Sequence, residues 1–340
     1  MKILGIESSA DETGAAVIED GTKLLSNVVA SSLDLHQAYG GIVPEIAARS
    51  HIEVIIPVID QAIKQANVEW EQIDRIAVTQ GSGLLGSLLI GVITAKTLAI
   101  AKQKPLIPIN HVQAHVYAAF LGPQKPNFPL LSLIVSGGHT QLVLFQNHQK
   151  YQILGQTTDD AAGEAYDKVA KMLGLPYPGG PSVSKCAENG DPQAYQLPTA
   201  KLPDKYDFSF SGLKTAVLRA AQTASGHDFT FPSAKLPAAL SEAQKADLAA
   251  SFQHTINQTL ANSLARATEE FSPTSVVVAG GVAASQTLRR TISEHVPKTE
   301  VIYPEMNLCT DNAAMIAALA FHQKPLVDPH QIKVIPNLHM

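Results

Sequence analysis

The stretch "KILGIESSADETGAAVIED" (residues 2–20) decides the fold, because two apolar runs flank the polar loop "ESSADETG" (7–14). The runs are expected to form strands that the loop joins as a hairpin. The stretch "LLSLIVSGGHTQLVLFQ" (130–146) repeats the pattern, with "VSGGHTQ" (135–141) as its loop. Both loops are rich in Gly, Ser and Thr, and their backbone N–H groups can approach an anion closely. Either loop alone is compatible with a plain hairpin turn, but their matching positions indicate a duplicated unit with two phosphate-facing loops.

The elements around these loops follow one order in both halves, β-β-β-α-β-α-β-α. In the first half we expect strands at 2–7, 14–20, 23–32, 75–80 and 105–109, and helices at 44–66, 84–102 and from His111 onward. In the second half we expect strands at 130–137, 139–146, 151–159, 275–281 and 300–304, and helices at 161–173, 241–268, 284–295 and 311–323.

This duplicated α/β layout resembles the actin-like superfamily of actin, hexokinase and Hsp70 (ASKHA, ribonuclease H-like), a likeness of fold that implies no function by itself. It predicts an N-terminal domain at 1–122 and a C-terminal domain at 123–310, with a nucleotide cleft between them. A loop-rich insert is expected at 174–240. The C-terminal helix, about 311–325, is expected to pack back on the first domain.

Size and composition are those of a globular protein. The chain has 340 residues, of which 45% are hydrophobic and 16% charged, with a net charge of −5. A protein that holds nucleic acid unaided usually carries a basic excess, so any nucleic-acid contact is expected to be local or shared with partners. Two distant cysteines and an N-terminus without an apolar signal core predict a cytoplasmic protein. The apolar run at 84–101 contains Lys96 and is expected to be a buried helix, not a membrane span.

Two histidines, His111 and His115, stand four residues apart where a helix follows the strand at 105–109. This spacing places both imidazoles on one helix face, at the end of a strand where α/β proteins place ligands. A metal site needs a third ligand, for which Asp311 is the candidate. The alternatives are two packing histidines and, for Thr310 or Asp311, a helix N-cap. A His-His-Asp set suits iron, zinc or manganese, and we expect one divalent transition metal per chain.

The second half has further candidate ligand residues. A strand ends in Gly-Gly within "VVVAGGVAAS" (276–285), which would let a flat group such as adenosine lie close to the backbone. Asp167 is a candidate for ribose hydroxyls, and Ser209, Ser211 and Lys214 crowd an expected helix start that suits an anion. The alternative for Gly-Gly is a tight strand-to-helix turn. For Asp167 and for the group at 209–214 the alternative is solvated loop residues, which each group taken singly favours.

Many motifs together resemble the tRNA threonylcarbamoyladenosine transferase family (TsaD in bacteria, once labelled O-sialoglycoprotein endopeptidase). They occur in family order over nearly the whole chain: "GIESSADETG", "LHQAYGGIVPEIAARSH", "GSGLLGSLLIG", "NHVQAH", "VSGGHTQL", "DDAAGEAYDKVAK", "YPGGP", "DFSFSGLKT", "AGGVAAS" and "CTDNAAMIA". The resemblance implies transfer of a threonylcarbamoyl group from threonylcarbamoyl-AMP to the N6 amine of the adenosine 3′ of the anticodon, in tRNAs reading codons that begin with A. It also implies TsaB-like and TsaE-like protein partners and no membrane.

The resemblance also implies roles for individual residues. The metal, Fe²⁺ as first choice and Zn²⁺ as alternative, would be held by His111, His115 and Asp311. Asp11 and Glu12 would be acidic residues tied to activity. Substrate contacts are implied for Ile134, Val135, Ser136, Gly137, Gly138, Asp167, Gly180 and Ser285.

Some positions depart from the family pattern. Ala10 replaces a cysteine, which excludes a nucleophilic thiol there, and Ser82 replaces a proline. Ser285 replaces an asparagine that contacts the nucleotide, and Ile134 stands where archaeal members have a metal-contacting tyrosine. Two other functions remain as alternatives. One is an ATP-binding ATPase or kinase of the actin-like superfamily. The other, less favoured, is a metallopeptidase, because Val112 stands where the zinc-peptidase motif H-E-x-x-H has its glutamate.

Overall fold

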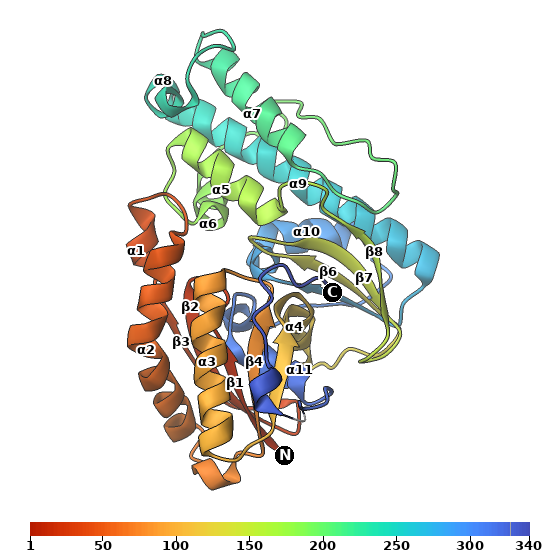
Figure 1. Ribbon diagram of the computed structural model, residues 1–340. Coiled ribbons are helices and arrows are strands. Elements are labelled where there is room, and N and C mark those ends of the chain that lie inside the picture. Colours follow the sequence, from red (N-terminus) through yellow and green to blue (C-terminus); the bar gives the residue numbers. More distant parts are fainter. Residues whose placement is uncertain (327) are drawn as a thin grey trace. The chain divides into compact units, whose positions relative to one another are not determined.

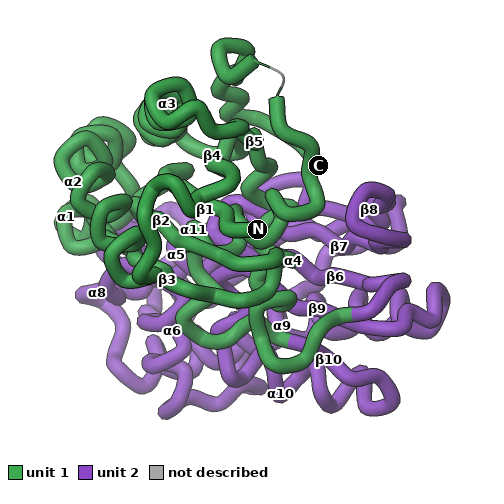
Figure 2. Tube along the Cα trace, turned by 90° about the horizontal axis from the view of Figure 1, so that it is seen from below, with its two compact units in different colours: residues 1–126, 303–340 green, residues 127–302 purple. Residues whose placement is uncertain are grey.

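The computed structural model describes residues 1–326 and 328–340, which divide into two compact units (Figures 1 and 2). Unit 1 combines Met1–Pro126 with Tyr303–Met340, and unit 2 is Asn127–Ile302. The chain therefore leaves unit 1, builds unit 2 and returns, as the green and purple tubes of Figure 2 show.

Unit 1 is built on a five-stranded mixed sheet with the strand order β3-β2-β1-β4-β5. The pairs β1–β2 and β2–β3 are antiparallel, whereas β4 and β5 run parallel to β1. The bounds are β1 Lys2–Glu7, β2 Glu12–Glu19, β3 Lys23–Ser31, β4 Arg75–Gly81 and β5 Leu106–Asn110. The hairpin and the parallel strands thus occur in the order that the apolar pattern predicted.

Two long helices cover one face of this sheet, α2 (Pro44–Gln65) and α3 (Leu85–Ala101) (Figure 1). Leu4 and Ile6, alternate residues of β1, belong to the same buried cluster as Ile59 of α2 and Ala95 of α3. Because successive side chains of a strand point to opposite faces, Gly5 points to the other side of the sheet. The short helix α1 (Leu33–Gln37) precedes α2.

The opposite face is covered by α11 (Ala313–Ala320), which approaches β1 and β2 closely. A Cβ atom added to Gly5 would lie 2.3 Å from the carbonyl oxygen of Ala313, so only glycine allows this approach. Every residue of α11 is buried, as expected for a helix that is apolar on all sides. The helix is shorter than the expected 311–323, because Asn312 caps it and a turn follows Ala320.

Unit 2 repeats the arrangement with the strand order β10-β9-β6-β7-β8. The strands β6, β7 and β8 are antiparallel neighbours, and β9 and β10 run parallel to β6. Their bounds are β6 Leu130–Val135, β7 Thr140–Phe145, β8 Tyr151–Gln156, β9 Ser275–Ala279 and β10 Val301–Ile302. The order matches that of unit 1 strand for strand, which confirms the duplication inferred from the two hairpins.

The helices of unit 2 pack around the 30-residue α9 (Glu242–Phe271). The other helices are α5 Ala162–Leu173, α6 Gly179–Ala187, α7 Ser211–Ala224, α8 Leu236–Ala239 and α10 Gln286–His295. The segment 174–240, expected to be rich in loops, contains α6, α7 and α8. Short helices of this kind give weak sequence signals, because their stability comes mainly from packing, here of α6 and α7 against α9. Among the described residues no helix has both the length and the apolar character that a bilayer crossing needs.

Candidate metal centre and substrate residues

His111 and His115 are the first and fifth residues of α4 (His111–Tyr117), which begins directly after β5. The side chain of Asn110 accepts a hydrogen bond from the backbone N–H of Gln113 at 3.1 Å and so caps the helix. This cap sets the helix start at the strand end. Both imidazoles are therefore presented on one side of α4, and both are buried.

Asp311 lies just before α11, but it is not the helix cap. The sequence predicted a cap at Thr310 or Asp311, and the structure places it at Asn312, whose side chain accepts from the N–H of Met315 at 3.1 Å. The Asn312 amide also donates to the carbonyl oxygens of Leu308 and Thr310, at 3.1 and 2.7 Å. These bonds leave the carboxylate of Asp311 outside the capping network.

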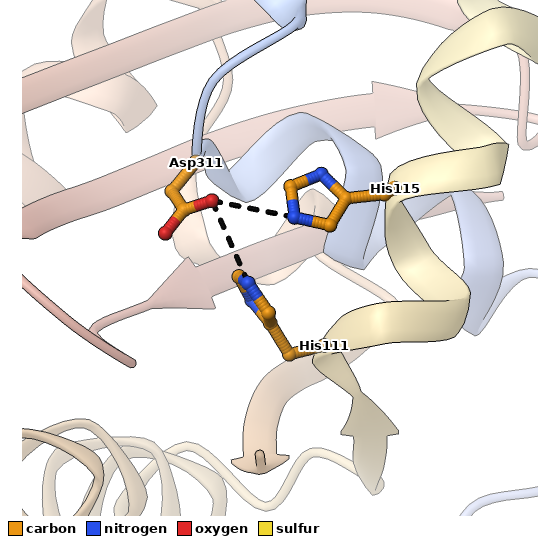
Figure 3. A group of neighbouring side chains, drawn as sticks. All are labelled: His111, His115 and Asp311. Carbon is orange, nitrogen blue, oxygen red and sulfur yellow. Dashed lines mark ion pairs between the residues drawn. The ribbon is translucent and has the colours of Figure 1, made fainter. Parts of the chain in front are cut away.

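The three side chains converge, as Figure 3 shows. Oδ1 of Asp311 lies 3.5 Å from Nε2 of His111 and 3.4 Å from Nε2 of His115, and all three donor atoms lie within 4.8 Å of one another. Ligands about 2.1 Å from a tetrahedral ion are themselves about 3.4 Å apart, so this set fits one metal ion with open positions for substrate.

The electrostatics of this place favour a cation. Burial lowers the pKa of His111, but Asp311 and Glu7 outweigh it and bring the value to about 9. Burial together with Glu7 and Asp11 raises the pKa of Asp311 to about 6, although His111 lowers it. Buried acids that raise one another's pKa are relieved by a positive charge, and a divalent ion supplies it.

Asp11 and Glu12 lie in the first predicted phosphate loop, and Glu12 is the first residue of β2. Burial, followed by the charges of Asp311 and Asp11, raises the pKa of Glu12 to about 10. The Asp11 side chain is also mostly buried. The charges of Asp11, Glu12 and Asp311 therefore interact.

A buried histidine supports the loop that carries these acids. His51 of α2 lies with Nδ1 2.7 Å from Oγ1 of Thr13 and with Nε2 3.0 Å from the carbonyl oxygen of Ala10. Burial lowers the pKa of His51, which favours the neutral ring that donates to Ala10 and accepts from Thr13. The loop is therefore attached to α2 through His51.

The sequence did not single out Glu7, Ser9 and Thr79, which lie beside the histidines. Nδ1 of His111 lies 3.2 Å from Oε2 of Glu7 and 3.2 Å from Oγ of Ser9. Thr79 donates its hydroxyl to Oε2 of Glu7 at 2.5 Å. One signal was available: Glu7 ends a strand of buried apolar residues, and a buried charge needs a specific partner.

The C-terminal segment 335–339 crosses the ends of β4 and β5, next to His111. Its backbone accepts hydrogen bonds from the N–H of Gly83 at 3.0 Å and from Nδ2 of Asn110 at 3.1 Å. It also donates an N–H to the carbonyl oxygen of Gln80 at 2.9 Å. The segment thus braces the cap of α4 and the loop after β4.

In unit 2 the predicted substrate residues begin at the end of β6. Ile134 and Val135 are buried in the strand, and Ser136, Gly137 and Gly138 form the turn to β7. A Cβ atom added to Gly137 or Gly138 would meet nothing within 4 Å, so this turn is open on its outer side.

Ser285 lies at the same edge of this sheet, because β9 runs parallel to β6 and leads to it. Its hydroxyl caps α10 by accepting from the N–H of Leu288 at 3.4 Å, and it lies 3.0 Å from Oγ1 of Thr287. The serine that replaces the expected asparagine therefore has a capping role of its own.

Asp167 and Gly180 come together through α5 and α6. The Asp167 carboxylate accepts from the backbone N–H of Gly179 at 2.7 Å, at the start of α6, and Gly180 follows. The start of α5 touches the β6 turn, because a Cβ atom added to Gly163 would lie 2.6 Å from the carbonyl oxygen of Ser136. The residues predicted at the end of β6, on α5 and at the start of α6 therefore lie in one region of unit 2.

At the start of α7, the candidate anion site, a carboxylate of the protein itself occupies the position that an anion would take. Asp159 accepts from the backbone N–H groups of Phe210 and Ser211, at 2.8 and 3.3 Å, and from the hydroxyl of Ser209. Lys214 forms an ion pair with Asp160 at 2.9 Å. The sequence showed the donors but not that Asp159 and Asp160 would fold onto them.

A family model described as TsaD, tRNA N6-adenosine threonylcarbamoyltransferase, matches residues 23–318 of the chain. A relative with that name from Thermomicrobium roseum is 52% identical over 95% of this chain and 92% of its own length. One from Bacillus anthracis is 48% identical over 93% of this chain and 89% of its own length.

Two solved structures share the fold at low sequence identity. Full-length HypF, in its phosphate- and nucleotide-bound form, has a TM-score of 0.60 at 13% identity and covers 94% of this chain and 46% of HypF. Component A of (R)-2-hydroxyglutaryl-CoA dehydratase from Acidaminococcus fermentans has a TM-score of 0.51 at 16% identity and covers 95% and 98% of the two chains. Together with the two matching sheets, these neighbours confirm the actin-like fold predicted from the sequence.

Proposed function

Because the chain belongs to the tRNA N6-adenosine threonylcarbamoyltransferase family, we propose that it transfers threonylcarbamoyl from threonylcarbamoyl-AMP to tRNA. The acceptor is the N6 amine of the adenosine 3′ of the anticodon, in tRNAs that read codons beginning with A. The observation that carries the proposal is the convergence of His111, His115 and Asp311 within 4.8 Å in a chain of this family.

The proposed metal ligands are these three residues. An ion held there, Fe²⁺ in the first place and Zn²⁺ as the alternative, would supply Lewis-acid polarisation and orientation of the acyl group. Val112, which makes hydrolysis by the zinc-peptidase mechanism unsuitable, is compatible with group transfer, because no water has to be activated by a neighbouring glutamate.

The proposed substrate residues lie in unit 2. The open turn of Ser136, Gly137 and Gly138, the Asp167 carboxylate, Gly180 and the hydroxyl of Ser285 would hold the adenylate, with Ile134 and Val135 in the strand behind the turn. In the reaction, the N6 nitrogen forms a bond to the carbonyl carbon, the bond from that carbon to the phosphate oxygen breaks, and AMP leaves with the electron pair. The amine must also lose a proton.

We propose that the pair Asp11 and Glu12 accepts this proton. With its pKa at about 10, Glu12 holds a proton at neutral pH as long as no cation offsets Asp311. A bound cation would lower the pKa of Glu12, so the pair becomes a better proton acceptor only in the metal-loaded protein. The pair Asp11 and Glu12 would thus be able to accept the proton only when the metal ion that orients the acyl donor is also bound.

The proposal includes protein partners, TsaB-like and TsaE-like. An apolar strip on unit 1 supports a partner of this kind, since side chains at helical spacing on α2 and α3 are exposed to solvent. Its members are Ile52, Ile56, Leu85, Leu89 and Ile93. Partners that carry basic surface would also provide for tRNA what a chain with a net charge of −5 lacks. A cytoplasmic location belongs to the proposal, because the substrate is tRNA and both cysteines, Cys186 and Cys309, are free thiols.

The direct test is a reconstituted reaction. Purified protein, TsaB-like and TsaE-like partners, tRNA and threonylcarbamoyl-AMP are expected to yield modified adenosine and AMP. His111→Ala should abolish both the product and the bound metal, whereas His254→Ala, a matched change at an exposed histidine of α9, should preserve both. Full transfer by His111→Ala would refute the metal role. If metal-free protein phosphorylated a sugar with ATP, the result would favour a kinase. If the protein cleaved a peptide and His115→Ala did not, the result would favour a metallopeptidase.

A further inference from the structure

Glu7 is a fully buried carboxylate at the end of β1 and has three hydrogen-bond partners, Ser9, Thr79 and His111. Oε1 accepts from the backbone N–H of Ser9 at 2.6 Å. Oε2 accepts from the hydroxyl of Thr79 at 2.5 Å and lies 3.2 Å from Nδ1 of His111. A carboxylate can only accept, so each of the three partners must donate to it.

This geometry decides which nitrogen of His111 carries a proton. Without a proton on Nδ1, two acceptors would face each other across 3.2 Å between two buried side chains, which is unfavourable. With the proton on Nδ1, the ring donates to Glu7, and Nε2, which points to Asp311, is left to bind a metal through its lone pair. The hydroxyl of Ser9 also lies 3.2 Å from Nδ1, but a carboxylate is the stronger acceptor for this N–H.

We infer that Glu7 is a positioning residue of the metal centre: it holds the proton of His111 on Nδ1 and thereby fixes the ring with Nε2 toward the ion. Hydrogen bonds from ligand histidines to carboxylates have this effect in metal sites in general, and their loss typically costs about 10- to 100-fold in metal affinity. The inference rests on the metal centre of the proposed function and adds a residue to it.

The same carboxylate connects the metal centre to the loop that carries the acids. Its other oxygen holds the N–H of Ser9, and the carbonyl of Ser9 accepts from the N–H of Leu84 at 2.8 Å. Glu7 therefore positions both His111 and the beginning of the loop that leads to Asp11. A replacement at this position is expected to affect the ligand and the loop together.

The variant Glu7→Gln tests the inference, because glutamine has the same shape but offers only one acceptor oxygen. Either its NH₂ group faces Nδ1 of His111 and favours the wrong tautomer, or it faces the N–H of Ser9 and loses that bond. Zn²⁺ affinity, measured by competition with a chromophoric chelator, should fall about 10- to 100-fold. Co²⁺ absorption spectra should show a changed ligand geometry.

Two control variants separate positioning from loss of a buried hydrogen bond. Thr79→Val removes a donor to the same oxygen, and Ser9→Ala removes the other group near Nδ1; both should keep a Zn²⁺ affinity close to that of the parent chain. If Glu7→Gln binds Zn²⁺ as the parent does, or if Ser9→Ala alone loses affinity, the inference is overturned. A parent chain that binds neither Zn²⁺ nor Fe²⁺ overturns the metal centre as well, so the two failures are distinguishable.

A second measurement does not depend on how the variants fold. In the Zn²⁺-loaded parent chain, ¹⁵N NMR of the histidine side chains should show a protonated Nδ1 and a metal-bound Nε2 for His111. A His111 ring with its proton on Nε2, or with Nδ1 as the metal ligand, would overturn the inference.

Discussion

Replacing Asn312 by alanine is expected to destabilise unit 1 and to displace Asp311. The Asn312 side chain is 1% exposed and makes three hydrogen bonds: it accepts from Met315 and donates to Leu308 and Thr310. Alanine removes all three. The carbonyl oxygen of Leu308 and the N–H of Met315 then lose their partner in a buried position, whereas the carbonyl oxygen of Thr310 belongs to an exposed residue.

The magnitude follows from these bonds. Loss of an Asn N-cap costs about 1 kcal/mol, and each further hydrogen bond lost to a carbonyl oxygen costs about 1 kcal/mol. The sum predicts a loss of about 3 kcal/mol in the free energy of unfolding of unit 1. Since Asp311 is the preceding residue, metal affinity should fall in the same variant.

The assay is urea unfolding followed by tryptophan fluorescence, because the only tryptophan, Trp70, lies in unit 1. A probe confined to one unit avoids treating a two-unit chain as a single transition. The control is Asn312→Ser, whose hydroxyl can still cap the helix, so it should recover about 1 kcal/mol of the loss. A loss below about 1 kcal/mol in Asn312→Ala would refute the reasoning, because it would show that α11 needs none of these bonds.

Two further predictions concern the neighbours of the site. Burial depresses the pKa of His51 below its unfolded value of about 6.5, so the free energy of unfolding should decline as pH falls through about 6.5, because the unfolded chain then binds the proton first. The urea midpoint of the parent chain should therefore fall between about pH 7.5 and pH 5.5, and that of His51→Gln should fall less; an equal decline in both would contradict this role of His51. Deletion of 335–340 removes the acceptor for the N–H of Gly83, so hydrogen exchange of the Gly83 amide should accelerate about tenfold, which corresponds to about 1.4 kcal/mol less protection. The amide of Gly174 in unit 2 serves as the control, and unchanged exchange at Gly83 would show that the C-terminal segment does not stabilise the loop after β4.

Local pattern was sufficient for the elements of the fold. The apolar alternation of β1 and β2 and the polar loop between them describe a hairpin whatever surrounds them, and the second hairpin at 130–146 showed the duplication. The matching strand orders of the two sheets confirm it. The boundaries of α11 and the helices within 174–240 were not predictable in this way, because capping by Asn312 and packing on α9 decide them.

For the candidate site, spacing alone placed His111 and His115 on one helix face. Asp311 was the candidate third ligand from the residues themselves, and the family resemblance implied the same residue. Sequence could not show what surrounds these side chains. The charge of Glu7 is tolerable in a buried strand only because His111, Ser9 and Thr79 donate to it, and they come from three other segments of the chain. Likewise, the sequence does not show that the carboxylate of Asp159 accepts hydrogen bonds from the backbone N–H groups at the start of α7.

The sequence by itself determined the order of the elements, the duplication, the family and the residue types of the candidate metal centre, because each of these is a property of neighbours along the chain. The tertiary structure decided which acid lies beside both histidines, which acid lies beside Nδ1 of His111, and which residue caps α11. Asp311, Glu7 and Asn312 are distinguished only by their partners, and burial makes each partnership obligatory, since an unpaired polar group without water costs more than any local preference contributes.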